Sequence, residues 1–278
     1  MSIIFEHTQK NYENNETIEI GNPHRTICRF CKGKEKPYRK KAHSAPEFLG
    51  NKTIFTLDEC DNCNSFFGEK IEPELKKFIG PSFLHNLKGK KGWPTSEAKG
   101  NIKLRSGNEH RIIDIVMSEN FTPKEHEILI KGEQFSCLKV YKGLLKILLS
   151  ILPDEYFPEF ESTFKWLMSG RDFMDLNHAP CAIVGRQAPD FRLENLMELS
   201  LVRDQLNEGA VYQMTAAFNS IKITLPFSPI LKIKLKMGEG IDEPIEYKKI
   251  HFEFIDFSNS YTRSDFKLFL DLSNVPQP

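Results

Sequence analysis

Two pairs of closely spaced cysteines place the strongest constraint on how this chain folds. Cys28 and Cys31 form one C-x-x-C pair, Cys60 and Cys63 form a second, and 28 residues separate the pairs. Thiolates at this spacing come from one tight turn, and two such turns complete a closed tetrahedral zinc site. Neither pair is surrounded by the βαβ pattern of a thioredoxin-like redox motif. The spacing therefore predicts a structural zinc ion held by four sulfurs.

The rest of the chain indicates a globular protein without a membrane span. Its first 20 residues are polar and acidic after four residues, which is unlike a secretory signal. No stretch approaches the ~18 consecutive apolar residues of a membrane span. We therefore expect a cytoplasmic protein, in which paired cysteines indicate a metal rather than disulfides. The two other cysteines, Cys137 and Cys181, stand among apolar residues and are expected to be buried.

The charges balance over the whole chain but not within it. Lys+Arg and Asp+Glu both number 38, which excludes a protein that is basic all over. Basic residues nevertheless gather around the first cysteine pair, and a second group follows at 88–105. Because phosphate contacts supply most sequence-independent affinity, we expect this region to bind nucleic acid with little sequence specificity, although a solvated loop remains an alternative. The expected contact residues are Lys36, Arg39, Lys40, Lys41 and Lys52.

Residues suited to phosphodiester hydrolysis stand between and just after the pairs. His43 lies between them, and Asn64 directly follows the second pair. Hydrolysis needs a base with a pKa near neutral, for which histidine is the natural choice. The phosphate charge calls for a divalent cation, and an amide oxygen is a suitable ligand for a hard ion.

These segments together resemble a known family. C-R-F-C, A-H-S-A-P-E-F-L-G-N-K and E-C-D-N-C-N-S-F-F-G-E are similar to the HNH endonucleases of the ββα-metal type, in their four-cysteine form. The resemblance covers roughly residues 25–80, under a quarter of the chain. It implies two strands and a helix around one catalytic Mg²⁺ or Mn²⁺. It also implies that His43, at the end of the first strand, activates water and that Asn64, on the helix, binds the metal.

Two positions depart from the family pattern. HNH proteins commonly carry an acidic or histidine ligand just before the base, where this chain has Ala42. Another ligand is then needed, and Glu47 is our candidate, with Asp58, Glu59 and Glu72 as further possibilities. The family's middle asparagine orients the loop of the base, and Asn51 is the residue nearest in type.

Patterning along the chain predicts an α+β fold with a small N-terminal module. We expect a leader at 1–22, the zinc-bound HNH nuclease module at 23–84, a basic linker or loop with short strands at 85–108, and a larger α+β accessory domain at 109–278. The accessory domain should contain a helical pair followed by an antiparallel sheet. The expected helices are Cys137–Leu152 and Glu155–Met168, and the expected strands are Arg111–Met117, Cys181–Val184, Val211–Ala217, Ile221–Pro226, Ile230–Met237 and Ile250–Phe257.

The expected function is metal-dependent endonuclease hydrolysis of nucleic acid, with double-stranded DNA as the expected substrate. Some bacterial defence nucleases join an HNH module to a sensor of a small signalling molecule, and this chain is similar in plan. By that analogy the accessory domain serves antiviral defence through regulation, targeting or oligomerisation, with a small molecule or partner protein as activator. Two alternatives stay open: a non-catalytic zinc-ribbon-like module that binds nucleic acid or a partner, and a silent subunit of a larger defence complex.

Overall fold

The structure is a computed structural model of the whole chain. It describes residues 1–10, 15–24, 26–34, 37–80, 95–98, 102–106, 113–116, 127–130, 132–173, 180–186, 195–207, 209–218, 221–229, 251–258, 261–263 and 266–269. Within these residues it has mixed α+β architecture, as predicted. None of the helices in this described part is long and apolar enough to cross a membrane.

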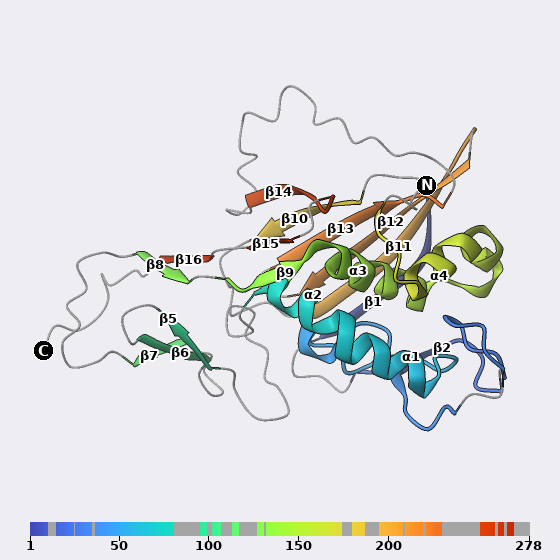
Figure 1. Ribbon diagram of the computed structural model, residues 1–278, viewed down its shortest axis with the longest axis horizontal. Helices are drawn as coiled ribbons and strands as arrows, with labels where there is room; N and C mark the ends of the chain where they lie inside the picture. Colours follow the sequence, from blue (N-terminus) through green and yellow to red (C-terminus); the bar gives the residue numbers. More distant parts are fainter. Residues whose placement is uncertain are drawn as a thin grey trace, which may run out of the picture.

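A six-stranded antiparallel sheet is the largest element of the fold (Figure 1). Along β12 buried residues alternate with half-buried ones, so one face of the sheet carries the core. The sheet confirms the antiparallel sheet predicted for the C-terminal part. Its strand order is β1 (Ser2–Lys10), β11 (Asn195–Leu206), β12 (Gly209–Phe218), β13 (Ile221–Phe227), β10 (Cys181–Arg186) and β14 (His251–Asp256).

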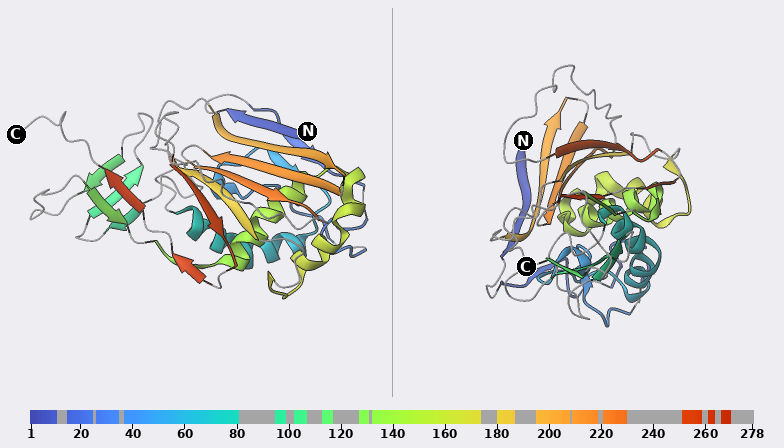
Figure 2. Two further views of the ribbon diagram at one scale, coloured as in Figure 1. Left: turned by 90° about the horizontal axis from the view of Figure 1, so that it is seen from above. Right: turned by 90° about the vertical axis from the view of Figure 1, so that its left-hand side faces the viewer.

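The predicted helical pair lies against this sheet (Figure 2). Helix α3 (Cys137–Ile151) begins where the Ser136 hydroxyl accepts a hydrogen bond from Lys139 N, and its end agrees with the prediction. The second predicted helix is split into a 3₁₀ segment, η4 (Asp154–Phe160), and helix α4 (Glu161–Met168). Phe160 joins them to the sheet, with its ring centroid 4.7 Å from that of Tyr212 on β12.

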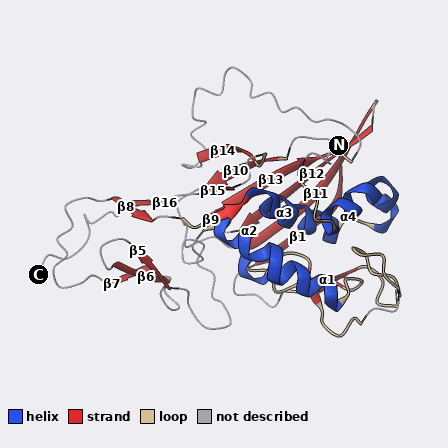
Figure 3. Cartoon of the chain, viewed as in Figure 1, coloured by secondary structure: helices blue, strands red, loops and turns tan. Residues whose placement is uncertain are grey.

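The N-terminal part contains a small mixed sheet followed by a bent helix (Figure 3). Strand β3 (Ala42–His43) is antiparallel to β4 (Ile54–Thr56), which is parallel to β2 (Ile18–Ile20). A 3₁₀ turn, η1 (Glu47–Leu49), lies in the β3–β4 loop and ends at Gly50, which adopts a left-handed φ of 92°. The helix comprises α1 (Asp61–Phe66), a π-helical segment η2 (Phe67–Ile71) and α2 (Glu72–Ile79). Along the chain, β3 and β4 are followed by this helix.

The expected loose leader at 1–22 is wrong for its first half. Residues Ser2–Lys10 form β1 at the edge of the large sheet, paired with β11 from Ser2↔Arg203 to Lys10↔Asn195. The sequence did not predict this strand, because an edge strand buries few residues and therefore shows only a weak alternation of apolar and polar residues. In β1 only Gln9 is buried, and that residue contacts the β3–β4 loop rather than the apolar core.

The remaining described strands form three small sheets. A three-stranded sheet has the order β5 (Thr95–Ala98), β6 (Ile102–Ser106) and β7 (Ile113–Val116), so short strands lie in the predicted linker. The other two sheets are strand pairs, β8 (Glu127–Ile130) with β16 (Phe266–Phe269), and β9 (Gln134–Ser136) with β15 (Tyr261–Arg263). The predicted strand Ile230–Met237 lies outside the described residues.

One hydrophobic cluster spans the N-terminal part, the helical pair and the large sheet. Helices α2 and α3 approach closely at Gly143, where an added Cβ would lie 3.2 Å from Leu75 Cδ2. A side chain at Gly143 would therefore require Leu75 to shift by a few tenths of an ångström. The predicted domain boundaries stay predictions, but the two parts pack as neighbours in one core.

Candidate functional site

The four cysteines of the two pairs meet at one point. Their sulfur atoms all lie within 4.8 Å of one another. Cys28 Sγ and Cys63 Sγ are 3.8 Å apart, and Cys31 Sγ and Cys60 Sγ are 3.9 Å apart. Four sulfurs at about 2.3 Å from a tetrahedral zinc ion would be about 3.8 Å from each other. The donor set and its spacing are therefore compatible with a structural Zn²⁺.

Local backbone structure explains how the first pair turns toward the second. Lys32 adopts a left-handed φ of 55°, and the Cys28 N–H donates to Gly33 O at 3.0 Å, which closes the turn. The Cys60 N–H points at Cys28 Sγ at 3.4 Å. A backbone N–H directed at sulfur stabilises a thiolate, which is the form that binds zinc.

Electrostatics in the cluster also suit a metal. The hydrogen bond with Cys63 lowers the pKa of Cys28 to about 4, whereas burial raises the pKa of Cys60 to about 11. Packed thiolates repel one another, so without a cation the sulfurs share protons. A bound Zn²⁺ would replace those protons and neutralise the buried charge.

His43 ends the short strand β3, where the sequence predicts the general base. Residue His43 pairs with Phe55 of β4, and the two rings lie 4.7 Å apart between centroids. The side chain is partly exposed. A base that acts on substrate and water needs such exposure, so the position is compatible with the predicted role.

Asn51 holds the loop between β3 and β4. It is completely buried, and its Nδ2 donates to Ala45 O at 2.8 Å and to Ile54 O at 2.9 Å. Its Oδ1 accepts from the N–H groups of Thr53 at 3.2 Å and Ile54 at 2.9 Å. These bonds satisfy the amide group and fix both ends of the loop after His43. Asn51 thus fixes the β3–β4 loop that follows His43.

Strand β1 supports the same loop from outside, which the sequence did not indicate. The Gln9 Nε2 donates to Gly50 O at 2.9 Å, and its Oε1 accepts from Lys52 N and from Thr53 Oγ1, both at 2.9 Å. The His7 Nε2 lies 3.1 Å from Thr53 Oγ1. A glutamine in a polar N-terminal segment gives no signal of such a role.

Two of the acidic candidates for the second metal have other partners. Asp58 is completely buried and accepts a hydrogen bond from Arg29 Nε at 2.8 Å. Glu59 is buried beside Lys146, with Oε2 3.3 Å from Nζ, and burial raises its pKa to about 7. An ion that binds substrate must keep open positions, and neither buried carboxylate offers access to one. Glu47 and Glu72 remain as candidates.

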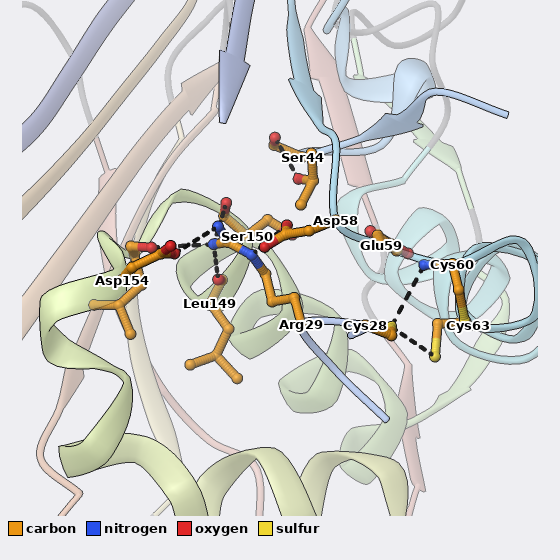
Figure 4. A network of polar contacts seen from close by, with 12 residues as sticks. Cys28, Arg29, Ser44, Asp58, Glu59, Cys60, Cys63, Leu149, Ser150 and Asp154 are labelled. Carbon is orange, nitrogen blue, oxygen red and sulfur yellow. Dashed lines mark hydrogen bonds and ion pairs between the residues drawn. The ribbon is translucent and has the colours of Figure 1, made fainter. Parts of the chain in front are cut away.

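Arg29 joins the cysteine cluster to the end of helix α3 (Figure 4). Its Nη1 atom donates to the carbonyl oxygens of Leu149 at 2.9 Å, and of Ser150 and Leu152 at 3.0 Å. Carbonyl groups at a helix C-terminus lack partners within the helix, and they attract positive charge. Arg29 therefore caps α3 from a position beside Cys28. The sequence placed Arg29 only in a basic group.

The structure does not show the ligands of the predicted catalytic metal meeting at one point. Asn64 lies half-buried on α1, with its N–H donating to Cys60 O at 3.0 Å, and Glu47 lies half-buried in η1. Among the described residues, the cysteine cluster is the one group of three or more His, Cys, Asp or Glu side chains that could share a metal. A catalytic Mg²⁺ or Mn²⁺ bound by Asn64 and Glu47 stays a prediction.

Four of the predicted nucleic-acid contacts are exposed around β3 and its loop. These exposed residues are Arg39, Lys40, Lys41 and Lys52. The Nζ atom of Lys41 forms an ion pair with Glu19 and lies 5.8 Å from the Phe55 ring centroid. Lys41 and His43 therefore both contact Phe55. The fifth predicted contact, Lys36, lies outside the described residues.

No family model, curated protein or solved structure matches this chain.

Proposed function

We propose that this chain is a metal-dependent endonuclease of the HNH type, which hydrolyses phosphodiester bonds of nucleic acid with His43 as the general base. One observation carries the proposal. His43 ends the first strand of a strand–loop–strand–helix unit whose loop is held by Asn51 and whose helix begins at a cysteine of the four-sulfur cluster. This is the arrangement that the resemblance to HNH endonucleases implies.

The proposed chemistry assigns one proton transfer to His43. The imidazole accepts a proton from water as the water oxygen attacks phosphorus, and the bond to the departing ribose oxygen breaks. Phe55 supports one side of the ring, and Asn51 fixes the loop that follows it. A divalent cation, bound by Asn64 in this proposal, would supply charge neutralisation at the phosphate. The exposed cations Arg39, Lys40 and Lys52 would bind the nucleic-acid backbone.

A plasmid-nicking assay tests the proposal. Supercoiled DNA is incubated with the zinc-loaded protein in Mg²⁺, Mn²⁺ or EDTA. We expect nicking with either ion and none in EDTA. His43→Ala should lower the rate by about 10²–10⁴-fold, the usual contribution of a general base, with unchanged folding and zinc content. The backbone carbonyl of His43 is kept in this variant.

His24→Ala is the matched control, because His24 is exposed and lies outside the strand–loop–strand–helix unit. It should nick at the wild-type rate. Equal nicking by His43→Ala and wild type would overturn the role of His43.

A non-catalytic binding module is the second candidate, and one set of observations favours it. Ala42 precedes His43, and the buried Asp58 and Glu59 are paired with Arg29 and Lys146. Fewer carboxylates are therefore available to a second metal. Wild-type protein that binds DNA but cuts neither DNA nor RNA with any divalent ion would support this candidate.

A further inference from the structure

Helix α3 contains two buried lysines in an otherwise apolar sequence. Lys142 is 4% exposed and Lys146 is 2% exposed. A buried ammonium group is costly unless it is paired or hydrogen-bonded, so each lysine needs partners. Lys142 Nζ donates to the carbonyl oxygens of Trp166, which lies in α4, and of Ser169, which directly follows α4. Its partners thus belong to the helical pair itself.

Lys146 has partners in the N-terminal part of the chain. Its Nζ donates to the backbone carbonyl of His43, across 103 residues of sequence. The same atom lies 3.3 Å from Glu59 Oε2 and 5.8 Å from the centroid of the Phe67 ring. Glu59 is completely buried, so this ion pair fixes the ammonium group in one place. Lys146 therefore connects helix α3 to strand β3, which ends at His43.

The strand that carries His43 is short. Strand β3 is two residues long, and its pairing with β4 consists of Ala42↔Thr56 and His43↔Phe55. The following residue adds two bonds, one from Ser44 N to Ile54 O at 3.1 Å and one between Ser44 Oγ and Thr56 Oγ1 at 2.8 Å. A hydrogen bond from an ammonium group is roughly twice as strong as a neutral one. The bond from Lys146 is thus a major restraint on the position of His43.

We propose that Lys146 is a positioning residue for the general base and that helix α3 thereby sets the reactive geometry of the nuclease site. This inference rests on the proposed function. Lys146 holds the carbonyl of His43, and Glu59 holds Lys146. The C-terminal part of the chain is then needed for the chemistry, rather than being only an accessory to a self-sufficient module.

Five full-length, zinc-loaded variants separate positioning from stability. Glu59→Gln keeps the lysine and its bond to the His43 carbonyl, whereas Lys146→Met removes both and leaves a buried carboxylate unpaired. The double variant Glu59→Gln/Lys146→Met removes both charges, which restores folding where a lone buried charge would prevent it. Lys146→Arg keeps the charge but moves the donor atoms. Lys142→Met is the matched control, because it removes a buried lysine from the same helix.

The kinetic readout is kcat and KM for nicking. The double variant should lose about a hundredfold in kcat, as expected when a reacting group is misplaced by about 1 Å, with KM within about twofold. Lys142→Met should stay within about threefold of wild type, and Glu59→Gln, which leaves Lys146 without its buried partner, should lose less in kcat than the double variant. Equal kcat for the double variant and wild type would overturn the proposal, as would an equal loss in Lys142→Met.

A second readout is independent of activity. The ring Cε1–Hε1 resonance of His43, assigned with His43→Ala, should shift or broaden in the double variant and stay fixed in Lys142→Met. If wild type does not nick, the proposed function fails, while this resonance still reports whether Lys146 positions His43. If the double variant does not fold, Lys146→Arg decides: about a tenfold loss in kcat at constant KM with a displaced resonance supports positioning, and no change in either rejects it.

Discussion

The four-cysteine part, residues 23–80, is called the zinc module here after its proposed metal. It is held together differently from the helix–sheet part, which is formed by α3, α4 and the six-stranded sheet. In the zinc module the strands are two or three residues long, and several buried residues are polar or charged, among them Asn51, Asp58 and Glu59. In the helix–sheet part β11 has 12 residues and β12 has 10, and the core is mostly apolar. Directed polar contacts therefore add to the apolar core in the zinc module, whereas buried apolar area dominates in the helix–sheet part.

Removing one sulfur ligand should give the largest effect and would show whether the zinc module depends on its metal. Zinc binding in small zinc domains is worth roughly 10–16 kcal/mol at neutral pH. Cys60→Ser should therefore release the zinc and unfold residues 23–80, measured by metal analysis and circular dichroism. Cys181→Ser is the control, because Cys181 is buried outside the cluster. Full zinc retention in Cys60→Ser would contradict the prediction.

Removing Arg29 should give the next largest effect, because this side chain connects the two parts. Arg29→Met removes the ion pair with the buried Asp58 carboxylate and the hydrogen bonds that cap the end of α3. Breaking a buried pair in this way costs about 3–5 kcal/mol, measured as a loss of unfolding free energy in denaturant. Arg203→Met, which breaks a partly exposed pair with Glu159, should cost about 1 kcal/mol or less. Similar losses of unfolding free energy for Arg29→Met and Arg203→Met would contradict the prediction that the buried pair contributes more to stability.

A smaller effect on stability is expected from the buried ammonium group of Lys142 in the helix–sheet part. Burial lowers the pKa of Lys142 to about 8, from an ordinary value of 10.5. Between these pH values the folded state binds fewer protons than the unfolded state, so this contribution to stability rises with pH and is most unfavourable below pH 8. Relative to Lys142→Met, wild type should therefore gain on the order of 2 kcal/mol between pH 8 and 10.5. Parallel stability curves for the two proteins would reject this.

The smallest effect is expected at the exposed cations of the zinc module. Lys40→Ala should weaken DNA binding to a similar extent for different sequences. It should also reduce the slope of log affinity against log salt by about 1, as for one lost phosphate contact. Fluorescence anisotropy over a salt series measures both. Lys165→Ala, an exposed lysine of α4 paired with Glu161, should leave the slope unchanged. Equal slopes for all three proteins would place the nucleic-acid surface elsewhere.

Local patterns in the sequence predicted several elements that the structure contains. The apolar periodicity and Pro153 located α3, and alternating residues located β10, β12 and β13. The same reasoning missed β1, an edge strand with one buried residue, and β11, whose Leu, Met and Glu residues favour a helix by intrinsic propensity. It also left the place of Asn51 open, since only the tertiary structure shows that its amide group bonds both ends of the β3–β4 loop.

The sequence by itself determined the four-sulfur cluster, because each C-x-x-C turn forms within four residues and brings two thiolates to one point. Tertiary structure decided what surrounds His43. The bonds from Gln9 to the loop, from Lys146 to the His43 carbonyl and from Arg29 to the end of α3 join residues 41, 103 and 120 positions apart. Such partners depend on how the elements pack, and neither residue type nor spacing along the chain specifies that packing.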